Sequence, residues 1–225
     1  MRESLEQYKR AALPTIRRLP SYLTILHSLR KNGVETVSGT LIAEKMQCEP
    51  IQVRKDLAVT GVVGRPRIGF NVQSVIESVE SFLGWNNSTD AFLIGAGSLG
   101  KALLGYSGFL ELNLNIITAF DSDPEKIGTV IRGRKVLDIQ RLENLAERMH
   151  IHVAILTVPA GVAQQIADRL VGCGICGIWN FTPEKLAVPD HVVVQNENLS
   201  SGLAVLCARL RQNQCGKEKQ GGSDG

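Results

Sequence analysis

The chain has 225 residues, of which 44% are hydrophobic and 21% are charged, a composition typical of globular proteins with room for two small domains. No apolar run is long enough to span a membrane, and Arg and Pro interrupt the first thirty residues, so we expect neither a signal peptide nor a membrane anchor. A cytoplasmic location is the default expectation. The five cysteines, an odd number, do not indicate a disulfide framework.

Charge is distributed unevenly along the chain. Residues 1–70 contain twelve Lys and Arg against six Asp and Glu, a net charge of +6, whereas the whole chain carries +3 and the remainder is therefore −3. A basic segment followed by a mildly acidic one predicts a polyanionic partner for the first segment alone.

The segment from Pro20 to Ala58 has the pattern of a small helical domain. It follows residues 1–14, which we expect to form a mobile arm, and Pro20 suits the first turn of a helix that ends at Asn32-Gly33. Ser38 can cap a helix through Met46, and a second helix follows over residues 50–58. Two short helices joined by a three-residue turn fit a helix-turn-helix. On the second helix we predict DNA contacts at Gln52, Arg54 and Lys55 and buried positions at Ile51, Val53 and Leu57.

Glycines surround Arg65-Pro66-Arg67, which predicts a hairpin with two guanidinium groups at its tip, the wing of a winged helix. In this interpretation Gln52 and Lys55 face base edges in the major groove. Arg65 and Arg67 meet phosphates or enter the minor groove. The alternative, a small helical domain with a solvated basic face, stays open from the residues alone.

A capping box at Ser74 and Glu77 predicts a connecting helix that Gly84 ends. From Ala91 onward, predicted strands and helices alternate, which indicates a doubly wound parallel sheet. The predicted fold class is therefore α/β, with an N-terminal winged helix-turn-helix domain and a Rossmann domain. The predicted domains are 1–84, 85–198, and a C-terminal helix with a disordered tail over 199–225. We expect strands at 91–95, 115–120, near 135–136, 152–158, 175–181 and 191–195, and helices at 98–106, just after Asp123-Pro124, 139–149 and 160–171.

The motif with the clearest chemistry is a Gly-x-Gly-x-x-Gly loop between an apolar run and a helix. Gly95 permits a tight turn, Gly97 lets a pyrophosphate approach, and Gly100 allows close packing of helix and strand. Asp121 ends a second apolar run 21 residues after Gly100. A carboxylate there can accept hydrogen bonds from ribose hydroxyls and repels a 2′-phosphate, which favours NAD(H) over NADP(H). The candidate loop residues are Gly95, Ala96, Gly97, Ser98, Leu99 and Gly100.

The segment from Leu199 to Arg211 is amphipathic and follows a sheet that already looks complete. Its apolar stripe, with Leu203, Leu206 and Leu210, can pack on a second subunit or on its own domain, and periodicity leaves both open. We expect a disordered, glycine-rich tail from Gly216.

Cys173 and Cys176 form a Cys-x-x-Cys pattern, which raises a redox or zinc interpretation. The sequence has no second such pair and no nearby pair of histidines, so we expect no metal site. The pair falls where a helix should end and a buried strand begin, a place where free cysteine packs as a small hydrophobe. A redox role for the two thiols stays open.

An NAD-dependent oxidoreductase is the main alternative from another class of protein. Such an enzyme needs a positioned acid or base and a substrate site. The four histidines, at 27, 150, 152 and 191, have no evident partner, and little chain remains for a substrate domain, so we expect no enzyme. A DNA-binding protein whose sheet domain binds another nucleotide, such as coenzyme A, or only dimerises, is a further alternative.

Over residues 15–212 the chain resembles Rex, a family of bacterial redox-sensing repressors. The resemblance lies in an ordered series of motifs rather than in one of them. The chain departs from the family pattern at Ala58-Val59-Thr60, where an aromatic pair is usual, and at Pro66 in the wing. It also departs at Asn198, where an Asp is common. The matching motifs are Gln52-Val-Arg-Lys-Asp-Leu57, Gly69-Phe-Asn-Val72, Gly95–Gly100, Tyr106-Ser-Gly-Phe109, Phe120–Gly128, Leu156-Thr-Val-Pro159 and Gly177–Pro183.

The resemblance implies a homodimer that binds an inverted-repeat operator in double-stranded DNA and releases it when NADH binds. It also implies that the C-terminal helix crosses the dimer interface, next to the nicotinamide pocket of the partner. By the same resemblance, Tyr106 lies near the nicotinamide and Asp121 at the adenosine ribose, with Pro159 and Phe181 along the pocket wall. Val158, the last residue of the predicted strand 152–158 and the neighbour of Pro159, completes the candidate cofactor-binding residues.

Overall fold

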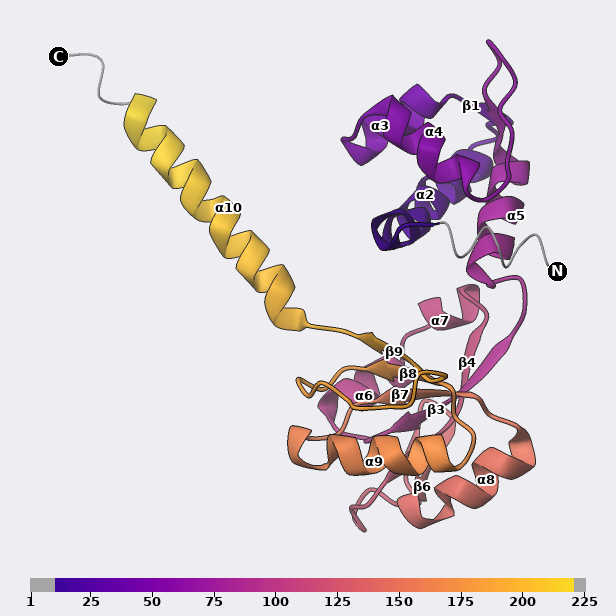
Figure 1. Cartoon of the computed structure of the whole chain (residues 1–225), viewed down its shortest axis with the longest axis vertical. Helices are drawn as coiled ribbons and strands as arrows, with labels where there is room; N and C mark the ends of the chain where they lie inside the picture. Colours follow the sequence, from indigo (N-terminus) through magenta and orange to yellow (C-terminus); the bar gives the residue numbers. More distant parts are fainter. Residues whose placement is uncertain (1–10, 221–225) are drawn as a thin grey trace. The chain divides into compact units, whose positions relative to one another are not determined.

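The computed structural model describes residues 11–220, with side chains throughout this range except at 199 and 213–220. The chain divides into two compact units, one that ends at Ser88 and one that begins at Thr89 (Figure 1). The first unit consists mainly of helices, and the second is built around a parallel sheet. None of the helices in the described part is long and apolar enough to cross a membrane.

The first unit is a small helical domain with a two-stranded sheet. Strands β1 and β2 pair antiparallel, with Val37 opposite Phe70, and close the unit between the helices. Its core holds fully buried side chains from all four helices, including Leu19, Ile42, Leu57 and Val75. The elements are α2 (Leu13–Lys31), β1 (Thr36–Val37), α3 (Gly39–Met46), α4 (Pro50–Ala58), β2 (Phe70–Asn71) and α5 (Val72–Leu83).

Two helices begin earlier than the sequence predicts. Helix α2 starts at Leu13, because Pro14 occupies its first turn, where a missing N–H breaks no helical hydrogen bond, and Pro20 lies inside the helix. Helix α5 starts at Val72, because the Asn71 side chain accepts a hydrogen bond from the Ser74 amide at 2.9 Å. Asn71 is therefore the cap, in place of the predicted Ser74. The predicted end at Gly84 is confirmed, with φ +73°.

The second unit contains a seven-stranded sheet in the order β5-β6-β4-β3-β7-β8-β9. All neighbouring strands are parallel except the edge strand β5, which pairs antiparallel with β6. The predicted doubly wound α/β fold is confirmed, although the short β5–β6 hairpin was not predicted. The strands are β3 (Thr89–Ile94), β4 (Leu114–Asp121), β5 (Val130–Ile131), β6 (Arg134–Asp138), β7 (Val153–Leu156), β8 (Gly177–Asn180) and β9 (Val193–Asn196).

Helices cover both faces of this sheet because alternate side chains of the central strand point to opposite sides. Phe92 and Ile94 belong to a core with α8 and α9, whereas Leu93 belongs to a second core with α6 and α7. The helix predicted just after Asp123-Pro124 is wrong, since the chain makes turns there. The elements are α6 (Ser98–Leu104), α7 (Gly108–Glu111), the 3-10 helix η1 (Ile139–Arg141), α8 (Leu142–Met149) and α9 (Ala160–Gly172).

The last helix, α10 (Leu199–Gln220), presents its apolar side chains to solvent. Leu203, Leu206 and Leu210 are more than half exposed, and every residue from 200 to 212 is exposed. The described side chains of α10 therefore do not bury this stripe on their own domain, which was one of the two alternatives. The helix continues to Gln220, past Gly216, where the sequence predicts a tail, and residues 221–225 lie outside the described residues.

Candidate functional site

The parallel strands create a crevice where the order of the sheet reverses. The chain runs from β3 to β4 and β6 on one side and then returns to place β7 on the other side of β3. In doubly wound sheets, ligands bind at this switch point, beyond the carboxyl ends of the strands. The segments that follow these ends carry Gly95–Gly100, Asp121, Thr157–Pro159 and Phe181.

Two of the three loop glycines are required by the fold itself. Gly95 has φ +99°, and a Cβ there would lie 2.8 Å from the Thr157 carbonyl oxygen. A Cβ on Gly100 would lie 2.0 Å from the Gly95 carbonyl oxygen, so the loop and α6 are in backbone contact. The Thr157 hydroxyl lies 2.7 Å from the same Gly95 oxygen and ties the loop to the end of β7. The predicted turn and close-packing functions are thus visible in the geometry.

Gly97 differs from these two glycines because the protein leaves space next to it. A Cβ built on Gly97 meets no protein atom within 4 Å, and its φ of −74° is open to any residue. Neither backbone strain nor packing requires glycine at this position. Space that a side chain would fill, in front of a tight backbone loop, fits the approach of a pyrophosphate group. The residues present therefore fit a dinucleotide.

Asp121 is held against the glycine loop by hydrogen bonds. Its Oδ2 accepts from the Ala96 amide at 2.8 Å, and its Oδ1 accepts from the Asp123 amide at 2.9 Å. The side chain is only 10% exposed, so the carboxylate joins the ends of β3 and β4. A carboxylate has about four acceptor positions, which leaves capacity for ribose hydroxyls. The sequence did not predict this contact with the loop.

Lys126 is a cation that the sequence analysis missed at this position. Its Nζ lies 3.3 Å from Asp121 Oδ2 and 3.2 Å from Asp123 Oδ2. Its hydrogen bond with Asp123 raises the pKa of Lys126, which stays protonated. The Glu125 amide and Lys126 lower the pKa of Asp123. The three side chains together carry a net charge of −1, so the local field still disfavours a 2′-phosphate, though less than Asp121 alone would.

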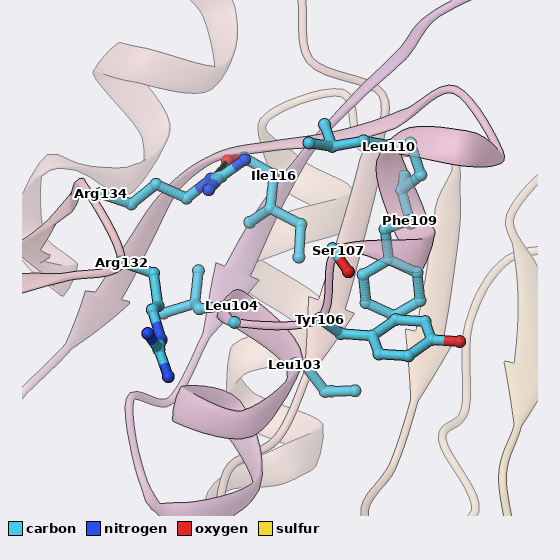
Figure 2. Close-up of a pocket in the computed structure, with 11 residues that line it drawn as sticks. Leu103, Leu104, Tyr106, Ser107, Phe109, Leu110, Ile116, Arg132 and Arg134 are labelled. Atoms are coloured by element: carbon cyan, nitrogen blue, oxygen red, sulfur yellow. Dashed lines mark hydrogen bonds between the residues drawn. The ribbon is translucent and has the colours of Figure 1, made fainter.

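Tyr106 and Phe181 lie at the two ends of a row of aromatic rings. The ring centroids are 4.9 Å apart for Tyr106 and Phe109, 5.6 Å for Phe109 and Trp179, and 5.0 Å for Trp179 and Phe181. Figure 2 shows the Tyr106 ring against Phe109. The row joins α7 to the end of β8, so the two predicted pocket residues Tyr106 and Phe181 belong to one row of rings. Phe109 and Trp179 were not predicted as wall residues because ring contacts between distant segments leave no local sequence pattern.

Two cavities flank the aromatic row. One of about 170 Å³ lies between the end of α6, the start of β4 and the arginines Arg132 and Arg134 (Figure 2). The other, about 410 Å³, lies beyond β8 and β9 and is lined by Phe181, Lys185 and Asn198 among others. Asn198 also accepts a hydrogen bond from the Ser200 amide at 2.9 Å at the start of α10. Of the predicted cofactor-binding residues, Phe181 lines this cavity.

Helices α3 and α4 form the predicted helix-turn-helix. Ser38 caps α3 through the Leu41 amide at 3.0 Å, and α4 begins at Pro50. Val53 and Leu57 are fully buried as predicted, but Ile51 is 53% exposed, so its predicted burial is wrong. Ile51 lies in the first turn of α4, outside the core, and Val53 is the first residue of this helix that the core buries.

The predicted basic contacts lie on the surface of the first unit. Arg54 and Lys55 on α4 and Arg65 and Arg67 in the wing are all exposed. Within residues 11–220, none of these four side chains has a hydrogen-bond or ion-pair partner. Gln52 differs, since its amide Nε2 donates to Asp56 Oδ1 at 2.9 Å and it is only partly exposed.

Asp56 is a buried carboxylate in the middle of the first unit. It is 1% exposed and accepts hydrogen bonds from Arg18 Nε at 2.6 Å and Tyr22 Oη at 2.7 Å. Thr15 Oγ1 at 2.9 Å and Gln52 complete the set. Burial alone raises the pKa of Asp56, but these donors outweigh it and hold the pKa below its usual value. The network ties α4 to α2.

The described residues do not support the redox or the zinc interpretation of the cysteine pair. Cys48, Cys173, Cys176 and Cys207 are free, and burial raises the pKa of the Cys173 thiol. Cys173 is buried, as expected for a free cysteine that packs as a small hydrophobe, whereas Cys176 is exposed, so that expectation is wrong for Cys176. No group of three or more His, Cys, Asp and Glu side chains in residues 11–220 is arranged to hold a metal ion.

The fold and the two surfaces define a class of protein: a winged helix-turn-helix unit joined to a Rossmann unit. Comparison with known proteins gives the same division, because a family described as a putative DNA-binding protein N-terminus matches residues 12–58 and a CoA-binding domain family matches residues 86–184. Its 50% identity over 202 residues to a redox-sensing transcriptional repressor Rex shows the particular family, and the chain belongs to the Rex family of redox-sensing transcriptional repressors.

Curated relatives and solved structures carry that assignment. The chain is 50% identical over 202 residues to the redox-sensing transcriptional repressor Rex of Treponema denticola, covering 90% of this chain and 96% of the relative. It is 40% identical over 201 residues to the Rex of Bacteroides fragilis, covering 89% and 91%. These relatives are named repressors, so the prediction of a repressor rather than a dehydrogenase is confirmed.

The Rex-family repressor RSP is similar in structure. Its complex with β-NADH has a TM-score of 0.84 and 36% identity, covering 93% of this chain and 98% of that one. Its complex with β-NAD+ and operator DNA has a TM-score of 0.85 and 36% identity, covering 95% and 99%.

Proposed function

We propose that this protein binds NAD(H) in the crevice of its sheet and an inverted-repeat operator through α4 and the wing, and that NADH binding releases the DNA. The observation that carries the proposal is the open space in front of Gly97, in a loop where Gly95 and Gly100 are fixed by backbone contacts. The complexes of RSP with β-NADH and with β-NAD+ and operator DNA support it. A repressor that acts on bacterial DNA belongs in the cytoplasm, and we propose that location.

In this proposal each candidate residue has a stated task. The glycine loop, with Ala96, Ser98 and Leu99, holds the pyrophosphate, and Asp121 accepts hydrogen bonds from the adenosine ribose. Val158, Pro159, Tyr106 and Phe181 line the nicotinamide pocket. Gln52, Arg54 and Lys55 face the major groove, while Arg65 and Arg67 contact phosphates or the minor groove. The domains would be 1–84 for DNA, 85–198 for the dinucleotide and 199–225 for dimer exchange.

The pocket walls provide the means to distinguish the two redox states. When bound, the cofactor supplies a nicotinamide ring that is neutral as NADH and cationic as NAD+. Tyr106, Phe109, Trp179 and Phe181 form a mostly apolar wall, and such a wall disfavours an uncompensated charge. A second subunit that closes against this wall would exclude water and strengthen the preference for the neutral ring.

Closure of the dimer would then move the recognition helices. A dimer reads two half-sites about one helical turn apart, so a modest rotation between subunits removes one α4 from its groove. The cofactor can shift the equilibrium between the two dimer arrangements only as far as its affinities for them differ. An operator affinity that falls about 100-fold corresponds to about 2.7 kcal/mol of coupling.

The proposal is tested by operator release. A fluorescent palindromic duplex, selected with the protein from a random pool, should bind the protein in the presence of NAD+ and dissociate when NADH is added at the same concentration. NADPH should act more weakly because of the net negative charge around Asp121. Coenzyme A is the control for the alternative nucleotide. A protein that binds the duplex but ignores both redox forms would be a constitutive DNA binder, and release by coenzyme A alone would replace NADH as the proposed ligand.

We further propose that α10 forms the homodimer by packing on the partner subunit. Its leucine stripe is more than half exposed at Leu203, Leu206 and Leu210, and unpaired apolar stripes on helices are covered in stable proteins. Truncation after Asn198 should therefore give monomers in sedimentation velocity, whereas the full chain should sediment as a dimer. The truncated chain should bind NADH at the glycine loop more weakly than the full chain, because part of the pocket would come from the partner. A truncated chain that stays dimeric would contradict the exchange.

A further inference from the structure

The wing is a tight hairpin whose tip holds an arginine in an unusual backbone conformation. Arg65 and Gly69 exchange two backbone hydrogen bonds, Arg65 N to Gly69 O at 2.7 Å and Gly69 N to Arg65 O at 2.9 Å. The Ile68 amide also donates to the Arg65 carbonyl oxygen at 3.2 Å, which closes a four-residue turn with Pro66 and Arg67 at its centre. Arg67 has φ +65°.

Proline at the second position and a positive φ at the third match a type II turn, in which glycine is the usual third residue. A type I′ turn is excluded, because it needs positive φ at Pro66, whose ring fixes φ near −65°. Arg67 therefore occupies a position that glycine fills without strain, where the Cβ of any other L-residue crowds the backbone. Strained conformations of this kind persist where the surrounding structure enforces them, and they concentrate at functional sites.

The base of the hairpin is fixed against the rest of the first unit. A Cβ on Gly69 would lie 2.4 Å from the Val37 carbonyl oxygen, and a Cβ on Gly64 would lie 2.9 Å from the Phe70 ring. The two glycines thus bring the hairpin into contact with β1 and with the Phe70 side chain. In Figure 1 the chain between α4 and β2 extends from the helices as a narrow loop. The tip is narrow and is carried on a fixed base.

No intramolecular contact explains why an arginine occupies the tip. The Arg67 side chain is exposed and has no hydrogen-bond or ion-pair partner in the described residues, and the same holds for Arg65. Val63 and Ile68, beside the two arginines, are 85% and 58% exposed. A narrow tip with guanidinium groups and apolar flanks matches the minor groove, whose narrow A·T-rich stretches attract arginine and accept apolar side chains.

We propose that Arg67 is the residue that makes this protein specific for a narrow, A·T-rich minor groove next to each half-site, and that the strained turn is kept for this purpose. The inference rests on the proposed DNA-binding function and names one specificity-determining residue within it. Two consequences follow together. Replacing Arg67 by glycine should relieve the turn and make the first unit more stable. The same replacement should remove the minor-groove preference and weaken operator binding.

The test uses the full-length protein and a duplex selected with it from a random pool, in which hydroxyl-radical footprinting locates the base pairs under the wing. Those pairs are replaced either by G·C, which places an amino group in the minor groove, or by I·C, which lacks that group but presents the G·C-like major groove. The matched control is Arg132→Gly, because Arg132 is exposed and has φ +50° in a hairpin of the other unit. That variant loses the same charge and relieves the same kind of strain.

Wild-type protein should bind the I·C duplex like the A·T duplex and the G·C duplex at least about tenfold more weakly. Arg67→Gly should bind the A·T duplex about tenfold more weakly than the wild type and should bind the G·C and A·T duplexes equally well. The slope of log affinity against log salt concentration should fall by about one, and the variant should unfold about 2–5 °C higher. Arg67→Lys should keep the salt slope and lose part of the discrimination, because lysine is more strongly hydrated. Arg132→Gly should bind all three duplexes like the wild type.

Either of two results with Arg67→Gly would overturn the inference and leave the proposed function standing. The variant could bind and discriminate the duplexes like the wild type, or it could melt at a lower temperature than the wild type. A wild-type protein that binds I·C as weakly as G·C would also overturn it, because the major groove would then carry the preference. Failure of the wild-type protein to select any duplex would overturn the proposed DNA-binding function itself.

Discussion

Replacing Gly97 by valine is expected to abolish NADH binding and to leave the protein folded and able to bind DNA. A Cβ at this position would have no protein atom within 4 Å apart from its neighbours along the chain, so the fold leaves room here for a side chain. The valine side chain would fill the space that we assign to the pyrophosphate. Isothermal titration calorimetry with NADH should therefore show no binding up to about 100 times the wild-type Kd, a loss of at least about 2.7 kcal/mol. The melting temperature should stay within about 2 °C of the wild type.

Gly100→Ala is the informative companion to this variant. Its Cβ would lie 2.0 Å from the Gly95 carbonyl oxygen, so the loop and α6 would have to separate. We expect Gly100→Ala to lower the melting temperature as well as NADH affinity, whereas Gly97→Val lowers affinity alone. Operator binding without cofactor should persist in Gly97→Val, and NADH should no longer release the DNA. Wild-type NADH affinity in Gly97→Val would remove the glycine loop from the proposed site.

The sequence predicted the elements whose causes are local. The alternation of apolar runs and helices gave the sheet, and Pro50 and Ser38 gave the starts of α4 and α3. Errors arose where two local causes compete for one boundary. Asn71 and Ser74 are both good caps, and Asn71 prevails because β2 ends there and aims its side chain at the first turn of α5.

In the candidate site, too, the sequence predicts what depends on local spacing and does not predict contacts between distant segments. The separate functions of Gly95, Gly97 and Gly100 follow from their spacing, and each one agrees with the geometry of the loop. The hydrogen bond from the Ala96 amide to Asp121 spans 25 residues and depends on β3 and β4 being neighbours, so spacing alone does not reveal it. The aromatic row that joins Tyr106 to Phe181 likewise depends on the packing of α7 against β8.

The recognition helix shows the limit of periodicity most clearly. Asp56 lies within the Gln52–Leu57 motif of the helix that we propose to contact DNA, and from the sequence an acidic side chain there looks like one more exposed charge. It is instead buried, because Arg18 and Tyr22, 38 and 34 residues earlier in the chain, donate to it from α2. A buried carboxylate with charged and neutral donors ties α4 to α2 and so sets the orientation in which α4 presents its basic side chains.

Replacing Asp56 by asparagine should therefore destabilise the first unit by about 3 kcal/mol, because removing one member of a buried ion pair leaves its partners unsatisfied. Arg18 is 30% exposed and can partly reach water, but the Tyr22 hydroxyl is buried, and burial together with Asp56 raises its pKa. The matched control is Glu44→Gln, which removes an exposed carboxylate of the same unit and should change stability by less than about 0.5 kcal/mol. Hydrogen–deuterium exchange of the full chain should show faster exchange over α2 and α4 in Asp56→Asn only, with the sheet unit unchanged.

The same network predicts how the first unit responds to acid. Because the folded pKa of Asp56 lies below its unfolded value of about 3.9, its contribution is complete above that value and is lost as the pH falls through the folded pKa. The wild type should thus lose stability below about pH 4, and Asp56→Asn should lose less over that range, since it has no carboxylate to protonate at this position. The difference in unfolding free energy between the two proteins should shrink as the pH falls. A difference that stays constant from pH 7 to pH 3 would show that the Asp56 carboxylate is not what holds α4 in place.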